Sequence, residues 1–150
     1  MMMQQATKVL IVDDDRPTVD FVMEALLDEG YTVRGTFDAV SALAAIEAEA
    51  PDVVLLDLRM PGASGAELFR TLVERELTSV PIILMTADNH AVDALIAEGV
   101  KFILVKPFDL ETLLDCLRGA LNAPQETQKQ GSQPVQEDPN TVPEDVHICK

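Results

Sequence analysis

Three acidic residues follow the first apolar run of the sequence, and their charges need a partner. The run Val9–Val12 leads directly into Asp13, Asp14 and Asp15. A short, continuously apolar run is typical of a buried parallel strand. Carboxylates crowded at the end of such a strand repel one another unless a shared proton or a cation neutralises them. A hard divalent cation such as Mg²⁺, which prefers oxygen ligands, would suit this cluster.

Other apolar runs end in residues that could take part in the same chemistry. Asp57, Thr86 and Lys106 each follow directly after a run of apolar residues. Ligands of open α/β sheets bind outside the carboxyl ends of the strands, so we expect these side chains to share one edge with Asp13 and Asp14. A carboxylate beside a metal can attack a phosphoryl group, while an ammonium and a hydroxyl bind its oxygens. The pattern therefore predicts phosphoryl chemistry assisted by Mg²⁺.

The elements that position these residues alternate along residues 8–121. Short apolar runs separate segments of helical period, in which Val19, Val22, Met23 and Leu26 fall at i, i+3, i+4 and i+7. Alternating strands and helices imply right-handed crossovers and a parallel sheet with helices on both faces. The sequence predicts an α/β fold of five βα units, with strands at 9–12, 31–34, 53–56, 82–85 and 102–105. The more polar second run favours an edge strand.

Composition and charge argue against several classes of protein. The net charge of −15 disfavours direct nucleic-acid binding, which needs a positive surface. The apolar runs are far too short to cross a bilayer, and the first residues lack a secretory apolar stretch. Cys116 and Cys149 are too few and too far apart to indicate a disulfide or zinc framework, and we expect Cys116 to be an inert packing residue. A cytoplasmic protein without membrane contact is expected.

The chain divides into three parts by composition. Residues 1–7 form an expected flexible start, and 8–121 form one folded domain. The segment 122–150 is rich in Gln, Pro and acidic residues and has no aromatic residue. It can bury too little to offset its ordering entropy, so disorder is expected. An anchor on a partner through Val146–Ile148 is the alternative for its end.

Four motifs make the sequence resemble the receiver domains of two-component response regulators. They are IVDDD at 11–15, LLDLRMPGASG at 55–65, MTAD at 85–88 and LVKPF at 104–108. The resemblance extends over residues 8–121. It implies a flavodoxin-like, doubly wound five-stranded sheet with strand order 2-1-3-4-5. It also implies a single-domain phospho-acceptor rather than an enzyme with a substrate of its own.

The same resemblance implies a role for each acidic motif residue. Asp57 would accept the phosphoryl group from a phosphohistidine of a sensor histidine kinase or phosphotransfer protein. Asp14 and the backbone carbonyl of Arg59 would bind Mg²⁺ directly, and Asp57 would be a further ligand. Asp13 would act on the metal largely through water.

The remaining motif residues would surround the phosphoryl group. Lys106 would contact its oxygens, and Thr86 would move to hydrogen-bond them. The family has a cis peptide bond at the position of Lys106–Pro107, which costs little before proline. Met60–Pro61 and Gly65 would shape the turn that follows the acceptor.

One position departs from the family. Receivers usually carry Tyr or Phe three residues before the lysine, as a switch coupled to the threonine, and here that position is Ile103. Phe102 lies one residue earlier. Successive strand residues point to opposite faces, so Phe102 should not take the place of the switch residue.

Arg59 and Asp88 suggest a further device at the site. Each lies two residues beyond a site residue, Asp57 or Thr86. An ion pair between them would overhang the acceptor and hinder the water that hydrolyses an aspartyl phosphate. An exposed pair contributes only about 0.2–1 kcal/mol, so its effect would be mainly steric.

Three functions remain open at the level of sequence. The first is a phospho-accepting regulator whose helix 4–strand 5–helix 5 face is read by an output protein, as a monomer or a phosphorylation-dependent dimer. The second is a receiver that binds its partner without phosphorylation. The third is a phosphatase of the haloacid-dehalogenase type, which would use Asp13 and Asp15 but leaves Asp57 unexplained.

Overall fold

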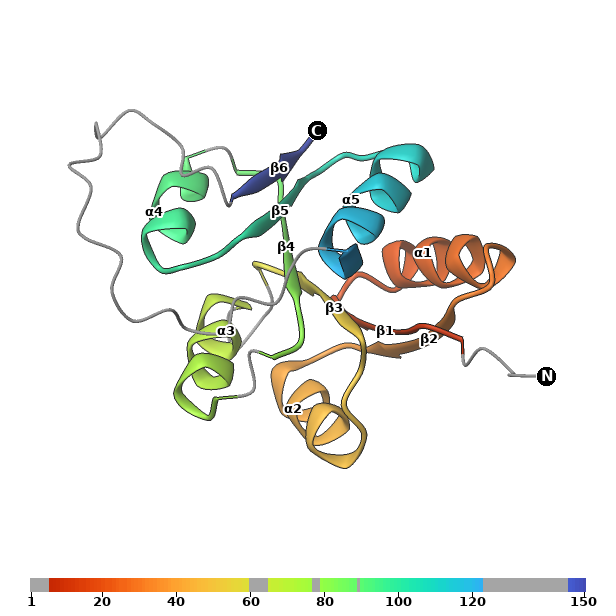
Figure 1. Cartoon of the computed structure of the whole chain (residues 1–150), viewed down its shortest axis with the longest axis horizontal. Helices are drawn as coiled ribbons and strands as arrows, with labels where there is room; N and C mark the ends of the chain where they lie inside the picture. Colours follow the sequence, from red (N-terminus) through yellow and green to blue (C-terminus); the bar gives the residue numbers. More distant parts are fainter. Residues whose placement is uncertain (1–5, 60–64, 77–78, 89, 123–145) are drawn as a thin grey trace.

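A single parallel sheet organises the molecule. The computed structural model describes residues 6–59, 65–76, 79–88, 90–122 and 146–150. The sheet has six strands in the order β2-β1-β3-β4-β5-β6 (Figure 1). The strands are β1 (Lys8–Val12), β2 (Thr32–Thr36), β3 (Val53–Asp57), β4 (Ile82–Thr86), β5 (Phe102–Val105) and β6 (His147–Cys149). The five predicted strands and their order are confirmed, with β2 at one edge.

Five helices follow the first five strands, and three of them begin after an aspartate that caps them. The five helices are α1 (Arg16–Asp28), α2 (Ala39–Ala48), α3 (Gly65–Glu74), α4 (Ala91–Ala97) and α5 (Leu110–Asn122). The carboxylates of Asp15 and Asp38 accept hydrogen bonds from backbone N–H groups three residues later, at 3.2 and 2.7 Å. Asp109 does the same for Thr112 at the start of α5, at 2.8 Å. These bonds satisfy donors that a helix cannot pair internally. Within the described ranges, no helix is long and apolar enough to cross a membrane.

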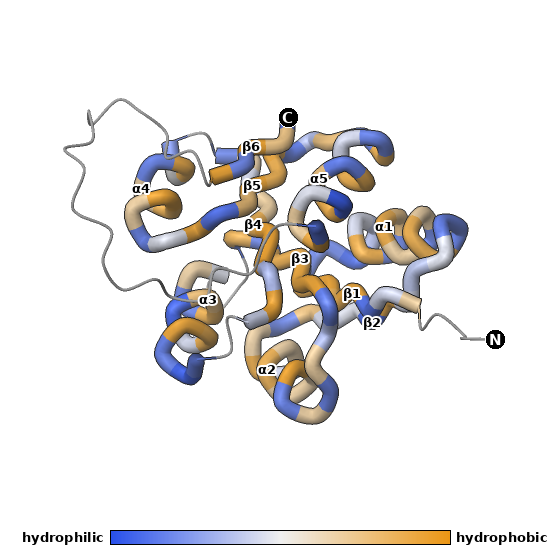
Figure 2. Tube along the Cα trace, in the orientation of Figure 1, coloured by the Kyte–Doolittle hydropathy of each residue, from blue (hydrophilic) through white to orange (hydrophobic). Residues whose placement is uncertain are grey.

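The helices cover both faces of the sheet and create two cores. On one face, α2, α3 and α4 bury their apolar sides against alternate residues of the central strands, and on the other face α1 and α5 do so. All five residues of β3 and of β4 are buried. Figure 2 shows that the apolar residues concentrate in the central strands. Cover on both faces explains why these strands read as continuous apolar runs rather than as alternating ones.

The end of the chain departs from the predicted disordered tail. His147–Cys149 forms β6, which pairs in parallel with β5, and Asn122 still belongs to α5. Residues 123–145 lie outside the described residues. The prediction of disorder used the average composition of 122–150, which does not reveal that three of these residues can pair with the free edge of β5 and pack on its neighbours. Ile148 therefore packs on this domain's own core, where a partner anchor was the alternative.

Candidate functional site

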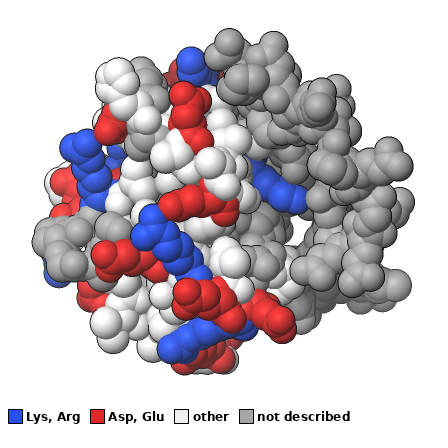
Figure 3. Space-filling view, turned by 90° about the vertical axis from the view of Figure 1, so that its left-hand side faces the viewer, with Lys and Arg blue, Asp and Glu red and all other residues white. Residues whose placement is uncertain are grey.

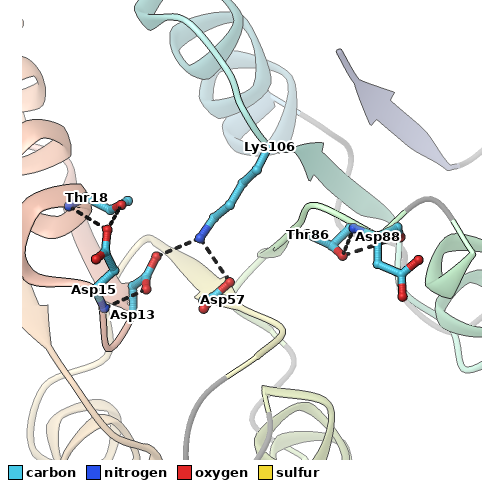
Figure 4. Close-up of polar contacts among 7 residues, drawn as sticks. All are labelled: Asp13, Asp15, Thr18, Asp57, Thr86, Asp88 and Lys106. Atoms are coloured by element: carbon cyan, nitrogen blue, oxygen red, sulfur yellow. Dashed lines mark hydrogen bonds and ion pairs between the residues drawn. The ribbon is translucent and has the colours of Figure 1, made fainter.

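An ammonium and two buried carboxylates meet at the carboxyl edge of the sheet. Lys106, just after β5, places Nζ 3.0 Å from Asp13 Oδ2 and 3.1 Å from Asp57 Oδ1 (Figure 4). The Asp13 side chain is fully buried, that of Asp57 is 11% exposed, and that of Lys106 is 24% exposed. Asp13 and Lys106 follow β1 and β5, and Asp57 is the last residue of β3, so the parallel topology brings together positions far apart in sequence.

Backbone contacts hold Asp13 in this cluster. Its Oδ1 accepts the N–H of Asp15 at 3.0 Å, and its own N–H donates to the Thr36 carbonyl at 3.1 Å. Asp15 is placed for this because its carboxylate binds the backbone N–H and the hydroxyl of Thr18 at the start of α1. Asp15 is the N-cap of α1, and its role in holding Asp13 was not predicted from the sequence.

The charges of the cluster are out of balance. Carboxylate oxygens of Asp13, Asp14 and Asp57 lie within 4.8 Å of one another, and Asp14 is exposed. Lys106 can offset one of the three negative charges. All the donors are oxygens, and the exposed Asp14 leaves one side open to water, which suits a small hard cation that keeps part of its hydration shell.

The same imbalance is visible in the protonation equilibria. Burial, the charge of Asp13 and, more weakly, that of Asp14 raise the pKa of Asp57 to about 6, although Lys106 opposes the shift. Burial of the Lys106 ammonium favours its neutral form, but the hydrogen bonds and charges of Asp13 and Asp57 outweigh burial and raise the pKa of Lys106. Asp57 is therefore an acid that the fold makes costly to ionise, beside a lysine that stays charged.

Thr86 ends β4 near this cluster but its hydroxyl is bound elsewhere. Its Oγ1 accepts the N–H of Asp88 at 3.0 Å and lies 3.5 Å from the Asp88 carbonyl. Figure 4 shows Thr86 and Asp88 to one side of the group formed by Asp13, Asp57 and Lys106. The sequence predicted correctly that Thr86 lies at the carboxyl edge of the sheet. It could not indicate that the Thr86 hydroxyl is hydrogen-bonded to the backbone of Asp88.

Arg59 and Asp88 lie close together at the site. Arg59 Nη2 is 3.2 Å from Asp88 Oδ2, and the Arg59 side chain is 80% exposed. The other oxygen of Asp88 accepts the N–H of His90 at 2.9 Å, which fixes the carboxylate at the start of the turn into α4. The pair thus joins the segment after β3 to the segment after β4.

Ile103 and Phe102 occupy opposite faces of β5. Ile103 is fully buried in the core shared with α2, α3 and α4, whereas Phe102 packs in the core shared with α1 and α5. The ring of Phe102 stacks on His147, with centroids 5.2 Å apart and planes at 9°. The place that the family usually fills with an aromatic switch residue is therefore aliphatic in this chain.

The turn after Asp57 is shaped by a close approach of backbone. Gly65 donates its N–H to the Leu58 carbonyl at 2.9 Å, and a Cβ on Gly65 would lie 2.0 Å from the Asp57 carbonyl oxygen. The peptide bond Lys106–Pro107 is cis, as the resemblance implied. Met60 and Pro61 lie outside the described residues.

Replacing Gly65 with alanine should therefore disturb the acceptor strand. The new methyl group meets backbone atoms, which cannot move aside as a flexible side chain can. We expect a loss of about 1–3 kcal/mol in the free energy of unfolding, measured by urea denaturation. Gly119→Ala on α5, where a Cβ would meet nothing within 4 Å, is the matched control and should be neutral or stabilising. Equal effects of the two substitutions would contradict the close approach.

The chain is similar to known receivers over most of its length. The family model of the response regulator receiver domain matches residues 9–118. The chemotaxis protein CheY4 of Vibrio cholerae is 32% identical with a TM-score of 0.72, over 78% of this chain and 100% of that chain. A putative response regulator from Chloroflexus aurantiacus is 29% identical with a TM-score of 0.73, over 78% of this chain and 98% of that chain. NtrX from Brucella abortus is 31% identical with a TM-score of 0.71, over 78% of this chain and 27% of that chain.

These likenesses agree with the parallel sheet and with the cluster at its carboxyl edge. The matched residues include Asp13, Asp57, Thr86 and Lys106, at the ends of the first, third, fourth and fifth strands. The chain belongs to the response regulator receiver domain family of two-component systems.

Proposed function

We propose that this receiver accepts a phosphoryl group on Asp57 and signals through a change in its surface. The observation that carries the proposal is the placement of the Asp57 carboxylate 3.1 Å from the Lys106 ammonium, within a cluster of three carboxylates. Asp57 offers a nucleophilic oxygen at the mouth of the sheet, and Lys106 offers a positive charge beside it. Phosphoryl transfer needs mainly positioning and charge neutralisation, which such an arrangement supplies.

The chemistry assigns a task to each residue. An oxygen of ionised Asp57 attacks the phosphorus of a phosphohistidine on a kinase or phosphotransfer protein, and the P–N bond to the leaving imidazole breaks. Mg²⁺, held by Asp13, Asp14, Asp57 and the Arg59 carbonyl, would neutralise charge on the phosphoryl oxygens. Lys106 exchanges its contact with Asp57 for one with a phosphoryl oxygen.

Thr86 connects the acceptor to the proposed output surface. A phosphoryl oxygen on Asp57 competes with the Asp88 carbonyl for the hydroxyl proton of Thr86, whose present contact with that carbonyl is 3.5 Å long. Movement of Thr86 biases the surface formed by α4, β5 and α5, and a partner protein that reads this surface also meets β6, which pairs with the edge of β5. Over α3 and α4, Figure 3 shows acidic and basic side chains interspersed rather than a surface of one sign.

Intact-mass analysis after incubation with acetyl phosphate tests the acceptor role. Wild-type protein should gain one phosphoryl group with Mg²⁺ and lose the gain when the metal is chelated. Asp57→Asn should gain none, whereas Asp20→Asn, an exposed change on α1, should behave as wild type. A gain that persists in Asp57→Asn would assign the phosphoryl group to another residue.

Arg59 should protect the phosphoryl group from water. The exposed Arg59–Asp88 pair joins the segments that follow Asp57 and Thr86, and we expect it to hinder the approach of water, so Arg59→Ala should speed dephosphorylation about two- to fivefold, as measured by the decay of the phosphorylated mass. Arg70→Ala removes a pair of similar exposure, with Glu98, and should leave the rate unchanged. Equal rates in wild type and Arg59→Ala would refute the protective role.

A receiver that works without phosphorylation is the second candidate. The aliphatic side chain of Ile103 favours it, because the aromatic relay of the family cannot operate with isoleucine at this position. Partner binding unchanged by Asp57→Asn and by acetyl phosphate would support this candidate. The phosphatase alternative fits less well, since the Asp15 carboxylate is bound to Thr18 rather than directed to a substrate.

A further inference from the structure

The two cysteines of the chain meet where α5 packs beside β6. Cys116 lies on the inner side of α5, and Cys149 ends β6, opposite Leu104 of β5. Both side chains pack in the core that α1 and α5 share with the sheet, and α5 contacts β6 directly. Figure 1 shows β6 at the edge of the sheet, next to α5. Both thiols are free in this structure.

Other contacts of β6 fix its register against β5. The His147 N–H donates to the Lys101 carbonyl at 2.7 Å, and its ring stacks on Phe102. Ile148 pairs with Ile103 and packs on the opposite core. A three-residue strand at the edge of a sheet opens more readily than the central strands, because it has one neighbouring strand rather than two.

We propose that Cys116 and Cys149 form a reversible intramolecular disulfide that locks β6 onto the edge of β5. The two residues are separated by most of the tail, so the bond would join the end of the chain to the body of the domain. The sequence alone suggested an inert Cys116, because a separation of this length does not reveal the contact. The disulfide is independent of the phosphorylation proposed above.

The environments of the two thiols give them different tasks. The hydrogen bond from Cys116 lowers the pKa of Cys149, which is also the more exposed of the two. The same hydrogen bond, together with burial, raises the pKa of Cys116. Cys149 is therefore the more exposed and the more readily ionised thiol, so an external oxidant reacts with it first and Cys116 completes the bond.

A low-molecular-weight disulfide such as glutathione disulfide is a sufficient oxidant. The Cys149 thiolate attacks one of its sulfurs, so a mixed disulfide forms and one glutathione thiolate leaves. The Cys116 sulfur, losing its proton to water, then attacks the Cys149 sulfur and expels the second glutathione. The protein loses two protons and two electrons, and the external disulfide is reduced to two thiols.

Incubation of the reduced full-length protein with glutathione disulfide, followed by acid quenching, alkylation and intact-mass analysis, tests the disulfide. Wild type should lose two hydrogen atoms, retain no glutathione and remain monomeric on a non-reducing gel. Cys116→Ser should stop at one glutathione on Cys149. Cys149→Ser should react at least about tenfold more slowly, because Cys116 is only 2% exposed. A wild type that retains glutathione, stays fully alkylated or forms linked dimers would overturn the proposal.

Hydrogen exchange of backbone amides tests whether the disulfide holds β6 on β5 or merely joins two thiols that lie close together. In the oxidised wild type, the His147 N–H should exchange at least about tenfold more slowly than in the reduced protein. Amides of β3 should be unchanged, and they also report whether the serine variants remain folded. A disulfide that forms without slowing exchange at His147 would show that the bond does not hold β6 on β5.

Discussion

Replacing Asp57 with asparagine is expected to stabilise the metal-free protein at neutral pH by about 1–3 kcal/mol. The fold raises the pKa of Asp57 from 3.8 to about 6, mainly through burial and through the charge of Asp13. Two pKa units correspond to a cost of about 3 kcal/mol for ionising this carboxyl in the folded state. Water at its exposed edge reduces that cost. Asparagine keeps the shape and removes the charge.

The pH dependence gives this prediction its sign. Between about pH 4 and pH 6 the folded protein binds a proton at Asp57 that the unfolded chain has already released. Stability of the metal-free wild type therefore falls as the pH rises through this window, and the advantage of Asp57→Asn appears over the same window. Thermal unfolding at a series of pH values, with a chelator present, measures the difference.

Two controls make the measurement specific to the cluster. Asp20→Asn, an exposed change, should shift stability by less than about 0.5 kcal/mol at every pH. Added Mg²⁺ should raise the melting temperature of wild type more than that of Asp57→Asn, since the variant has lost one charged ligand. An Asp57→Asn variant that is less stable than wild type at neutral pH without metal would contradict the proposed charge imbalance.

Lys106→Met should have the opposite effect and lower the metal-free stability by about 2–4 kcal/mol at neutral pH. The substitution removes the ammonium that contacts Asp13 and Asp57 at 3.0 and 3.1 Å. Asp13 is fully buried, and removing one partner of a buried ion pair leaves a charge without compensation. Uptake of a proton by Asp57 limits the loss. Urea denaturation measures it, and acetyl phosphate labelling should slow markedly in the same variant.

The coupling between the two residues can be measured directly. In Lys106→Met/Asp57→Asn, one carboxylate fewer remains uncompensated, so the double variant should be more stable than Lys106→Met alone. Lys8→Met is the matched control: Lys8 pairs with Glu49, but both side chains are exposed, so this substitution should change the stability much less. If Lys106→Met costs no more than Lys8→Met, the carboxylates do not depend on the ammonium.

The sequence by itself determined the sheet and the place of the site. Strands buried on both faces read as apolar runs, and capping residues such as Asp38 and Asp109 mark the helices between them. Since parallel strands share one carboxyl edge, residues that end those runs meet, as Asp13, Asp57 and Lys106 do. These properties depend on local period and on a general rule of topology, and both can be read along the chain.

Only the tertiary structure decided which side chains and backbone groups contact one another within this sheet and at its carboxyl edge. No periodic signal in the sequence marks the bond between Thr86 and Asp88, the approach of Gly65 to the Asp57 backbone, or the packing of Cys116 and Cys149 in one core. The same holds for β6, whose three residues are too few to show a period. They become a strand because the edge of β5 offers hydrogen bonds and an apolar surface in the right register, and that edge exists only once the domain has folded.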